Sequence, residues 1–175
     1  MSLILWINGR TPICTCGYLK LWHGEVNSSG NSQHLFDPYS FSHILHGLLF
    51  YPLLWILTKK LPTKYRFFSA LLIEAGWEIL ENSNFIINRY RSVTISFDYF
   101  GDSIVNSIGD LISMSLGFWI ASKAKIWQTI ALFLVIETLL LFWIKDNLTI
   151  NLIQLIHPIA AIKQWQYNTG AVQPK

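Results

Sequence analysis

Acidic side chains recur at helical spacing in an apolar stretch near the middle of the sequence. Glu74, Glu78 and Glu81 follow one another at i, i+4 and i+7, which places all three on one face of a helix. The residues around them are largely apolar, so this helix would carry an acidic stripe along an otherwise hydrophobic surface.

A second stripe follows after a short loop. Asp102, Asn106 and Asp110 are spaced i, i+4 and i+8 and share one face of the next apolar stretch. A charge at the centre of a membrane helix costs about 2.5–3.5 kcal/mol on insertion scales, so such residues persist where they face one another, a cavity or a ligand. We therefore predict a polar site inside the membrane rather than simple hydrogen bonding between helices, which needs fewer charges.

Two histidines stand near the start of an earlier apolar stretch. His43 and His46 are spaced i, i+3 and can contact one ligand together. Beside carboxylates they would serve as metal ligands or as a general base with its orienting acid. The sequence lacks an HExxH motif, so we predict a network without metal or other cofactor, in which the carboxylates shift their pKa or pair with Arg91.

The loop between the two acidic stretches supplies candidate substrate-binding residues, which are Arg89, Arg91 and Asp98. A guanidinium group recognises phosphate or carboxylate through two parallel hydrogen bonds, and Arg91 is the better placed of the two arginines. The other arginine would then be an ordinary interfacial anchor. A lipid head group or a lipid-linked phosphate would suit such a site.

Composition identifies the environment of these residues. Hydrophobic residues make up 52% of the 175 residues and charged ones 13%, with a mean hydropathy of +0.37, well outside the range of soluble domains. The net charge of +3 comes from scattered residues, which argues against a nucleic-acid partner. Cys14 and Cys16 are too few for a four-thiolate zinc site, and a disulfide across one residue would be strained.

The hydrophobic pattern predicts an all-α fold: one membrane domain over residues 1–175, a polytopic transmembrane helix bundle. An extramembrane N-terminal segment covers residues 8–40, and the tail from residue 145 is expected to be an interfacial or packed helix. The approximate spans are 41–57, 67–87, 101–121 and 127–144.

Charges in the short loops predict the orientation. The loop Thr58–Arg66 holds four basic residues and the connector after the third span holds two, so both are expected in the cytoplasm. Residues 88–100, the N-terminal segment and the tail would then face outward. On this topology the histidines and both acidic stripes converge near the outer leaflet.

Three blocks of sequence carry a resemblance to a known family: NSQHLFDPYSFSHILHG, IEAGWEILENSNFIINRYRSVTISFDYFGDSIVNSIGD and KDNLTINLIQLIHPIAAIKQWQ. They resemble an uncharacterised bacterial inner-membrane family, known as a domain of unknown function. That family usually begins with a further hydrophobic helix ahead of GRTPICTCG, of which residues 1–7 would be the end. More distantly, Glu78 or Glu81, Arg91, Asp102, Asn106 and Gly109 look like the pattern of VanZ-like proteins of the cell envelope.

The sequence thus predicts a multi-pass protein of the bacterial inner membrane with a membrane lipid or lipid-linked molecule as its partner. One hypothesis is a hydrolase or transferase, in which Glu78 or Asp102 works with His43 or His46 as acid and base. The alternatives are a non-enzymatic lipid or ion binder, a transporter, or an accessory subunit of an envelope complex. Transporters usually contain internal repeats, and none is evident here, which favours the enzyme.

Overall fold

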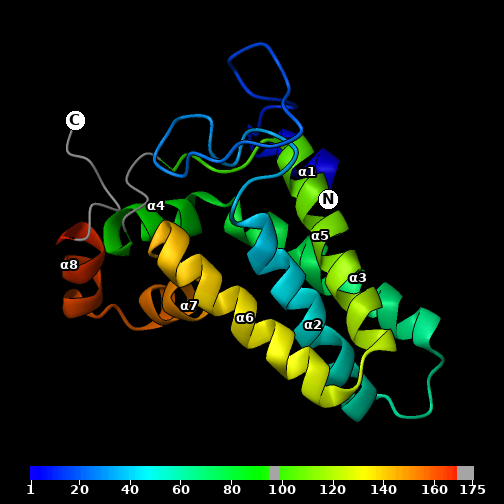
Figure 1. The fold of residues 1–175 in the computed structure, drawn as a ribbon. Helices are drawn as coiled ribbons and strands as arrows, with labels where there is room; N and C mark the ends of the chain where they lie inside the picture. The colour runs from blue at the N-terminus through cyan, green and yellow to red at the C-terminus, as the bar shows by residue number, and fades with distance from the viewer. Residues whose placement is uncertain (95–98, 169–175) are drawn as a thin grey trace.

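The regular elements of the structure, a computed structural model that describes residues 1–94 and 99–168, are helices (Figure 1). Within this part of the chain, Trp22 and Phe36 also form an isolated parallel β-bridge. The helices are α1 (Ser2–Ile7), α2 (Ser40–Leu57), α3 (Thr63–Glu81), α4 (Asn84–Val93), α5 (Ile104–Lys123), α6 (Ile126–Ile144), α7 (Leu148–Ile156) and α8 (Ala160–Asn168).

Three of the described helices are long and apolar enough to cross a membrane: α2, α5 and α6. They match the predicted spans 41–57, 101–121 and 127–144 to within three residues at each end. Helix α6 is the most apolar of the three, and large side chains such as Ile130, Leu134 and Phe142 are exposed along it. Such a surface is suited to contact with lipid tails.

A second span was predicted over 67–87, and the helix found in this region has different boundaries. Helix α3 begins earlier, at Thr63, and ends at Glu81, and its charged residues leave it outside the three candidate spans. Helix α3 stops at its C-cap residue, Asn82, because Ser83 begins a new helix as its N-cap. The Ser83 side-chain oxygen accepts a hydrogen bond from the Ile86 amide. Helix α4 covers residues 84–93, of which 84–87 were predicted as the end of the span and 88–93 as the start of the loop.

The tail also differs from the single helix predicted for it. It forms two short helices, α7 and α8, separated at His157 and Pro158. Asn147 begins α7 by accepting a hydrogen bond from the Ile150 amide. Pro158 has no amide hydrogen to continue the helix, which explains the interruption.

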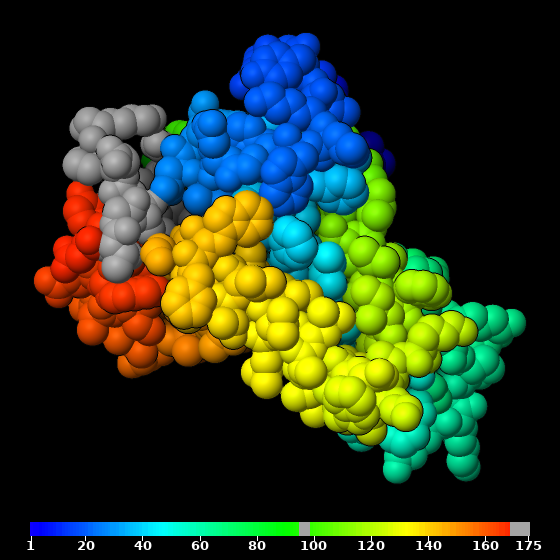
Figure 2. Space-filling view, viewed as in Figure 1, coloured from blue at the N-terminus to red at the C-terminus, as the bar shows by residue number. Residues whose placement is uncertain are grey.

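Residues 8–39 form a polar cap over one end of α2 and α5 (Figures 1 and 2). Its carbonyl groups accept hydrogen bonds from the first amides of α5: Ser32 from Ser103 at 2.9 Å, and Thr11 from Ile104 at 2.8 Å. These amides have no partner within their own helix, so the cap completes the N-terminus of α5.

A disulfide within the cap joins Cys14 to Cys16. The sequence argued against such a bond because only one residue separates the two cysteines. The cap also packs on α6, where Trp22 stacks on Trp143 with ring centroids 6.0 Å apart.

Helices α2 and α5 share the most extensive contact between the described helices, and two glycines permit their close approach. A Cβ atom on Gly47 would overlap the backbone of Met114 and Phe118, and one on Gly117 would overlap the carbonyl of Ile44. Small residues let membrane helices approach until their backbones touch. Leu45, Leu48 and Ala121 are buried beside this crossing and form one apolar cluster.

We predict that Gly117→Ala destabilises the protein by about 1–3 kcal/mol, because the added methyl group must push α2 away from α5. Unfolding in detergent, followed by circular dichroism, measures the change. Gly76→Ala in α3 is the matched control, since a Cβ there meets nothing within 4 Å, and alanine favours a helix over glycine by about 1 kcal/mol. Equal stability of the two variants would contradict the role assigned to Gly117.

Candidate functional site

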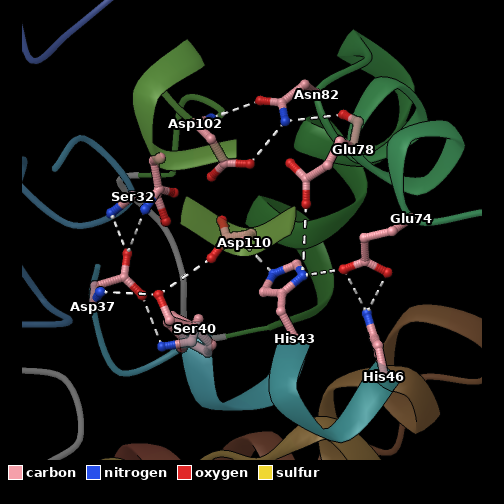
Figure 3. A network of polar contacts seen from close by, with 12 residues as sticks. Ser32, Asp37, Ser40, His43, His46, Glu74, Glu78, Asn82, Asp102 and Asp110 are labelled. Atoms are coloured by element: carbon pink, nitrogen blue, oxygen red, sulfur yellow. Dashed lines mark hydrogen bonds and ion pairs between the residues drawn. The ribbon is translucent and has the colours of Figure 1, made fainter. Parts of the chain in front are cut away.

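A cavity of about 340 Å³ lies between α2, α3, α5, α7 and the cap. Its polar wall is built from His43, His46, Glu81, Asp102, Asn106 and Asp110, together with Asn31, Ser32, Tyr39, Ser42, Tyr90, Tyr99 and Asn151. Its apolar wall is built from Leu49, Phe50, Ile73, Trp77, Leu148, Leu152 and Leu155. The sequence predicts seven catalytic candidates: His43, His46, Glu78, Glu81, Asp102, Asn106 and Asp110. Six of them line the cavity, and the seventh, Glu78, has its Oε1 3.6 Å from Nδ1 of His43 (Figure 3).

Glu74 joins the two histidines. Its Oε1 lies 2.6 Å from Nδ1 of His43, and its Oε2 lies 3.0 Å from Nδ1 of His46. The Glu74 side chain is fully buried. It reaches both histidines because α2 and α3 are neighbours, and His43 and His46 lie about one turn apart on the same face of α2. An ionised carboxylate only accepts hydrogen bonds, so each histidine carries its proton on Nδ1 and directs the lone pair of Nε2 away from Glu74.

His43 is surrounded by two further acids (Figure 3). Oε1 of Glu78 lies 3.6 Å from its Nδ1, and Oδ2 of Asp110 lies 3.9 Å from its Nε2. Both separations are too long for a hydrogen bond. The other oxygen of Asp110 accepts a hydrogen bond from the hydroxyl of Ser40 at 3.2 Å.

Asp102 is fixed by the residue that ends α3. The Asn82 side chain donates to Oδ2 of Asp102 at 2.8 Å, and the Asp102 amide donates back to Asn82 at 2.6 Å. The Tyr99 hydroxyl donates to the second carboxylate oxygen at 3.1 Å. This reciprocal pair links the C-terminus of α3 to the segment that enters α5.

Asp37 organises the part of the cap that touches the site. Its carboxylate accepts hydrogen bonds from the amides of Ser32 at 2.9 Å and Tyr39 at 2.8 Å. Asn106 donates to the His34 carbonyl at 2.8 Å and lies 3.4 Å from Asp37. Burial raises the pKa of Asp37 above its ordinary value, although the hydrogen bonds from Tyr39 and Ser32 oppose the shift.

The two arginines predicted to bind substrate do not line the cavity described above. Arg89, on α4, donates from Nε to the Leu155 carbonyl at 3.0 Å and so ties α4 to α7. The guanidinium of Arg91 lies 4.9 Å from the centre of the Phe100 ring. Asp98 falls outside the described residues. Neither arginine belongs to the described lining of the cavity.

A second group of acids joins α6 to α7. Glu137, expected to close the polar core, accepts hydrogen bonds from the Leu148 amide at 2.9 Å and the Thr149 amide at 3.1 Å, and thereby caps α7. Asp146 accepts one from the Tyr39 hydroxyl at 3.2 Å. Burial raises the pKa of Asp146 to about 6.

Sequence reasoning placed Glu74 on the acidic stripe but not among the catalytic candidates, and it left Asp37 out of the site. Glu74 belongs to the same stripe as Glu78, and its distance from Glu78 equals about one turn, as does that of His46 from His43. This equal spacing in two neighbouring helices was the feature of the sequence that could have indicated contact between Glu74 and the histidines. Asp37 was interpreted as the entry to a helix because proline follows it, and nothing in the sequence indicated its contact with Asn106.

Two sets of residues within this network offer three ligand atoms to a metal ion: His43, His46 and Glu74, and His43, Glu78 and Glu81. The ligand atoms of each set lie within 4.8 Å of one another. A third set, Cys14, Cys16 and His34 in the cap, includes the two cysteines of the disulfide, which leaves no thiolate to bind a metal.

Comparison with known proteins identifies relatives along nearly the whole chain. The family described as "Protein of unknown function (DUF2585)" matches residues 5–168. A UPF0314 protein of Paracoccus denitrificans is 48% identical over 163 residues, which cover 93% of this chain and 84% of the relative. A UPF0314 protein of Rhizobium etli is 52% identical over 161 residues, with coverages of 92% and 83%. No solved structure gives a significant match.

The hydrogen bonds of Asp37 predict a local role in stability. Asp37→Ala should loosen the cap at a cost of about 3 kcal/mol, because the buried amides of Ser32 and Tyr39 lose a charged acceptor. Limited proteolysis should then cut the chain within residues 8–39, which the wild-type protein resists. Glu25→Ala, an exposed acid in the same segment, should leave the pattern unchanged. Unaltered cleavage in Asp37→Ala would contradict this account.

Proposed function

The chain belongs to the DUF2585 family, and we propose that it is a multi-pass helical protein of the bacterial inner membrane that acts as an enzyme. Its reaction would be hydrolysis or group transfer on a lipid or lipid-linked molecule of the cell envelope. The observation that carries this proposal is a cavity with one polar and one apolar wall, into which a histidine oriented by a buried glutamate projects.

The two walls fit the two parts of an amphipathic substrate. A volume of about 340 Å³ is at the small end of ligand pockets and suits a head group rather than a whole lipid. The head group would contact the acids and amides of the polar wall. The first part of a hydrocarbon chain would lie against Phe50, Trp77 and Leu152, since apolar surface is the favourable contact for it.

His46 is the best candidate for proton transfer. Its Nδ1 faces Glu74, and its ring is fixed by stacking on Phe50 and by an edge contact with Trp77. Glu74 thereby holds one tautomer and stabilises the imidazolium that forms when Nε2 takes up a proton. His46 lines the cavity and its side chain is 14% exposed, so a bound substrate can reach it.

Helix α3 would be a fourth membrane span in this proposal. Its 19 residues extend about 28 Å as a helix, close to the thickness of the hydrocarbon core. Glu74 and Glu78, the acids in its interior, are completely buried against the histidines of α2. The charges that lower its hydropathy would therefore not meet lipid.

Two features support an outward-facing site. The cap beside the cavity contains a disulfide, and disulfides persist in oxidising compartments such as the periplasm. The basic residues of Thr58–Arg66 lie at the opposite ends of α2 and α3 (Figure 1), and positive charge favours the cytoplasmic side. Both observations support a proposed orientation with the polar end of the bundle at the outer leaflet.

A binder, a transporter or an accessory subunit would use the same cavity without chemical change of its ligand. The VanZ-like resemblance stays a prediction, which the matches above do not address. The difference between an enzyme and a binder is testable, because only an enzyme leaves unconverted substrate behind when a single proton-transfer group is removed.

We predict that cells lacking this protein accumulate a lipid or lipid-linked species that the wild-type gene removes. His46→Gln should fail to remove it, because loss of a general base typically lowers a rate by about 10²–10⁴-fold. Lipid extracts analysed by mass spectrometry give the readout, with protein abundance measured in the same cells. His157→Gln alters an exposed histidine outside the cavity and should restore the wild-type lipid profile. Full restoration by His46→Gln would overturn the enzymatic proposal.

The orientation has its own test. A reporter enzyme that is active only in the periplasm should give signal when fused after Thr94 and none when fused after Pro62 or Ala124. The reason is that the last two positions lie in the basic loops. The reverse pattern would place the cavity at the cytoplasmic face.

A further inference from the structure

We propose that His43, Glu78 and Glu81, with Asp110 beside them, bind one divalent transition-metal cation of the Zn²⁺ or Mn²⁺ class. This inference deepens the function proposed above, since it concerns the polar end of the same cavity. The sequence predicted a network of side chains without metal, whereas we now propose that the same side chains bind a cation.

The first observation is the orientation of His43. Its Nδ1 lies 2.6 Å from Glu74, and a metal-ligating histidine usually donates its other ring N–H to a carboxylate in this way. The lone pair of Nε2 is consequently available, and it faces Oδ2 of Asp110 at 3.9 Å. A hydrogen bond requires a shorter separation, whereas two ligands of one ion, with bonds of about 2.0–2.2 Å, lie about 3–4 Å apart.

The second observation is independent of the first. Glu78 is fully buried, and among residues 1–94 and 99–168 neither of its carboxylate oxygens has a hydrogen-bond partner. Its side chain points toward His43 (Figure 3), and its Oε1 lies 3.6 Å from Nδ1 of that ring. A buried acid is normally satisfied by donors or by a positive charge. An ion held between Glu78 and His43 supplies that charge.

Glu81 brings a further oxygen to the same place. One ligand atom from each of His43, Glu78 and Glu81 lies within 4.8 Å of the other two. Glu81 lines the cavity, so an ion bound there would be reachable by a substrate. Among the described residues of the cavity wall none is lysine or arginine, and the ion pairs of Glu74, Glu78 and Asp110 within that part of the chain involve only histidine.

The other histidine set is a poorer metal site. In it the carboxylate ligand, Glu74, already accepts hydrogen bonds from Nδ1 of His43 at 2.6 Å and Nδ1 of His46 at 3.0 Å. An ion there would have to break these contacts. The set around Glu78 loses no hydrogen bond of the glutamate when an ion enters.

The donor set narrows the choice of ion and suggests its use. One imidazole and several carboxylates suit Zn²⁺, Mn²⁺ or Fe²⁺ rather than the softer Cu⁺. A cation at this position would give the acidic cavity a local positive charge. It would let the site accept an anionic phosphate or polarise a carbonyl group of the substrate.

Metal analysis of the full chain tests the proposal directly. The protein is purified in detergent without chelator, incubated with Zn²⁺ or Mn²⁺, desalted, and measured by inductively coupled plasma mass spectrometry. About one equivalent of one ion should remain on the wild-type protein. Glu78→Gln should weaken binding by about 10–100-fold, although it keeps the shape of the side chain and removes no hydrogen bond.

His46→Gln is the matched control, since His46 belongs only to the other set, and it should keep its equivalent of metal. The unfolding temperature gives a second readout: added Zn²⁺ or Mn²⁺ should raise it for the wild type and His46→Gln but not for Glu78→Gln. A wild-type protein that retains neither ion, full retention by Glu78→Gln, or loss in His46→Gln would each overturn the site. Failure of the lipid experiment with metal retained would instead count against the proposed reaction alone.

Discussion

The contact between α2 and α5 determines where everything else lies. Lipid tails are as apolar as leucine, so membrane helices gain little from hydrophobic burial and depend on close packing. Gly47 and Gly117 provide it by bringing the two backbones together. His43 stands one turn from Gly47 on α2, and Asp110 stands two turns from Gly117 on α5. The same contact that holds the helices together thus sets the distance between these two side chains.

Helix α3 adds a requirement of its own. Its buried glutamates would be costly in isolation, since an unpaired buried charge loses far more hydration energy than it recovers. Two histidines on α2 provide the partners that the structure assigns to Glu74. The polar faces of α2 and α3 therefore depend on each other, and removal of either would expose uncompensated charge to hydrocarbon.

The sequence predicted the features that follow from periodicity and missed those that depend on contacts across the chain. Spacing was enough to place Asn106 and Asp110 on one helix and His43 and His46 on another, because a helix fixes which residues share a face. It was wrong for Asp102, which lies two residues before α5 begins at Ile104. The break after Glu81 was missed because the apolar pattern continues through Phe85 and Ile87, while the stop depends on the capping side chain of Ser83. To predict the pairing of Glu74 with both histidines, one must know how far α2 and α3 are shifted along their axes relative to each other. Local sequence patterns do not contain this information.

The cap has a consequence for how the molecule is made. Residues 8–39 leave the ribosome before any of the long helices, yet the amides of Ser103 and Ile104 that they must meet are synthesised about seventy to ninety residues later. On the proposed topology, the early segment has to wait on its side of the bilayer while α2 and α3 insert. The pocket consequently forms late in biogenesis: the start of α5 must first dock against this segment, and α7, which is synthesised later still, completes the lining. A nascent chain arrested before that stage contains the histidines and the glutamates but not the complete cavity that they line or adjoin.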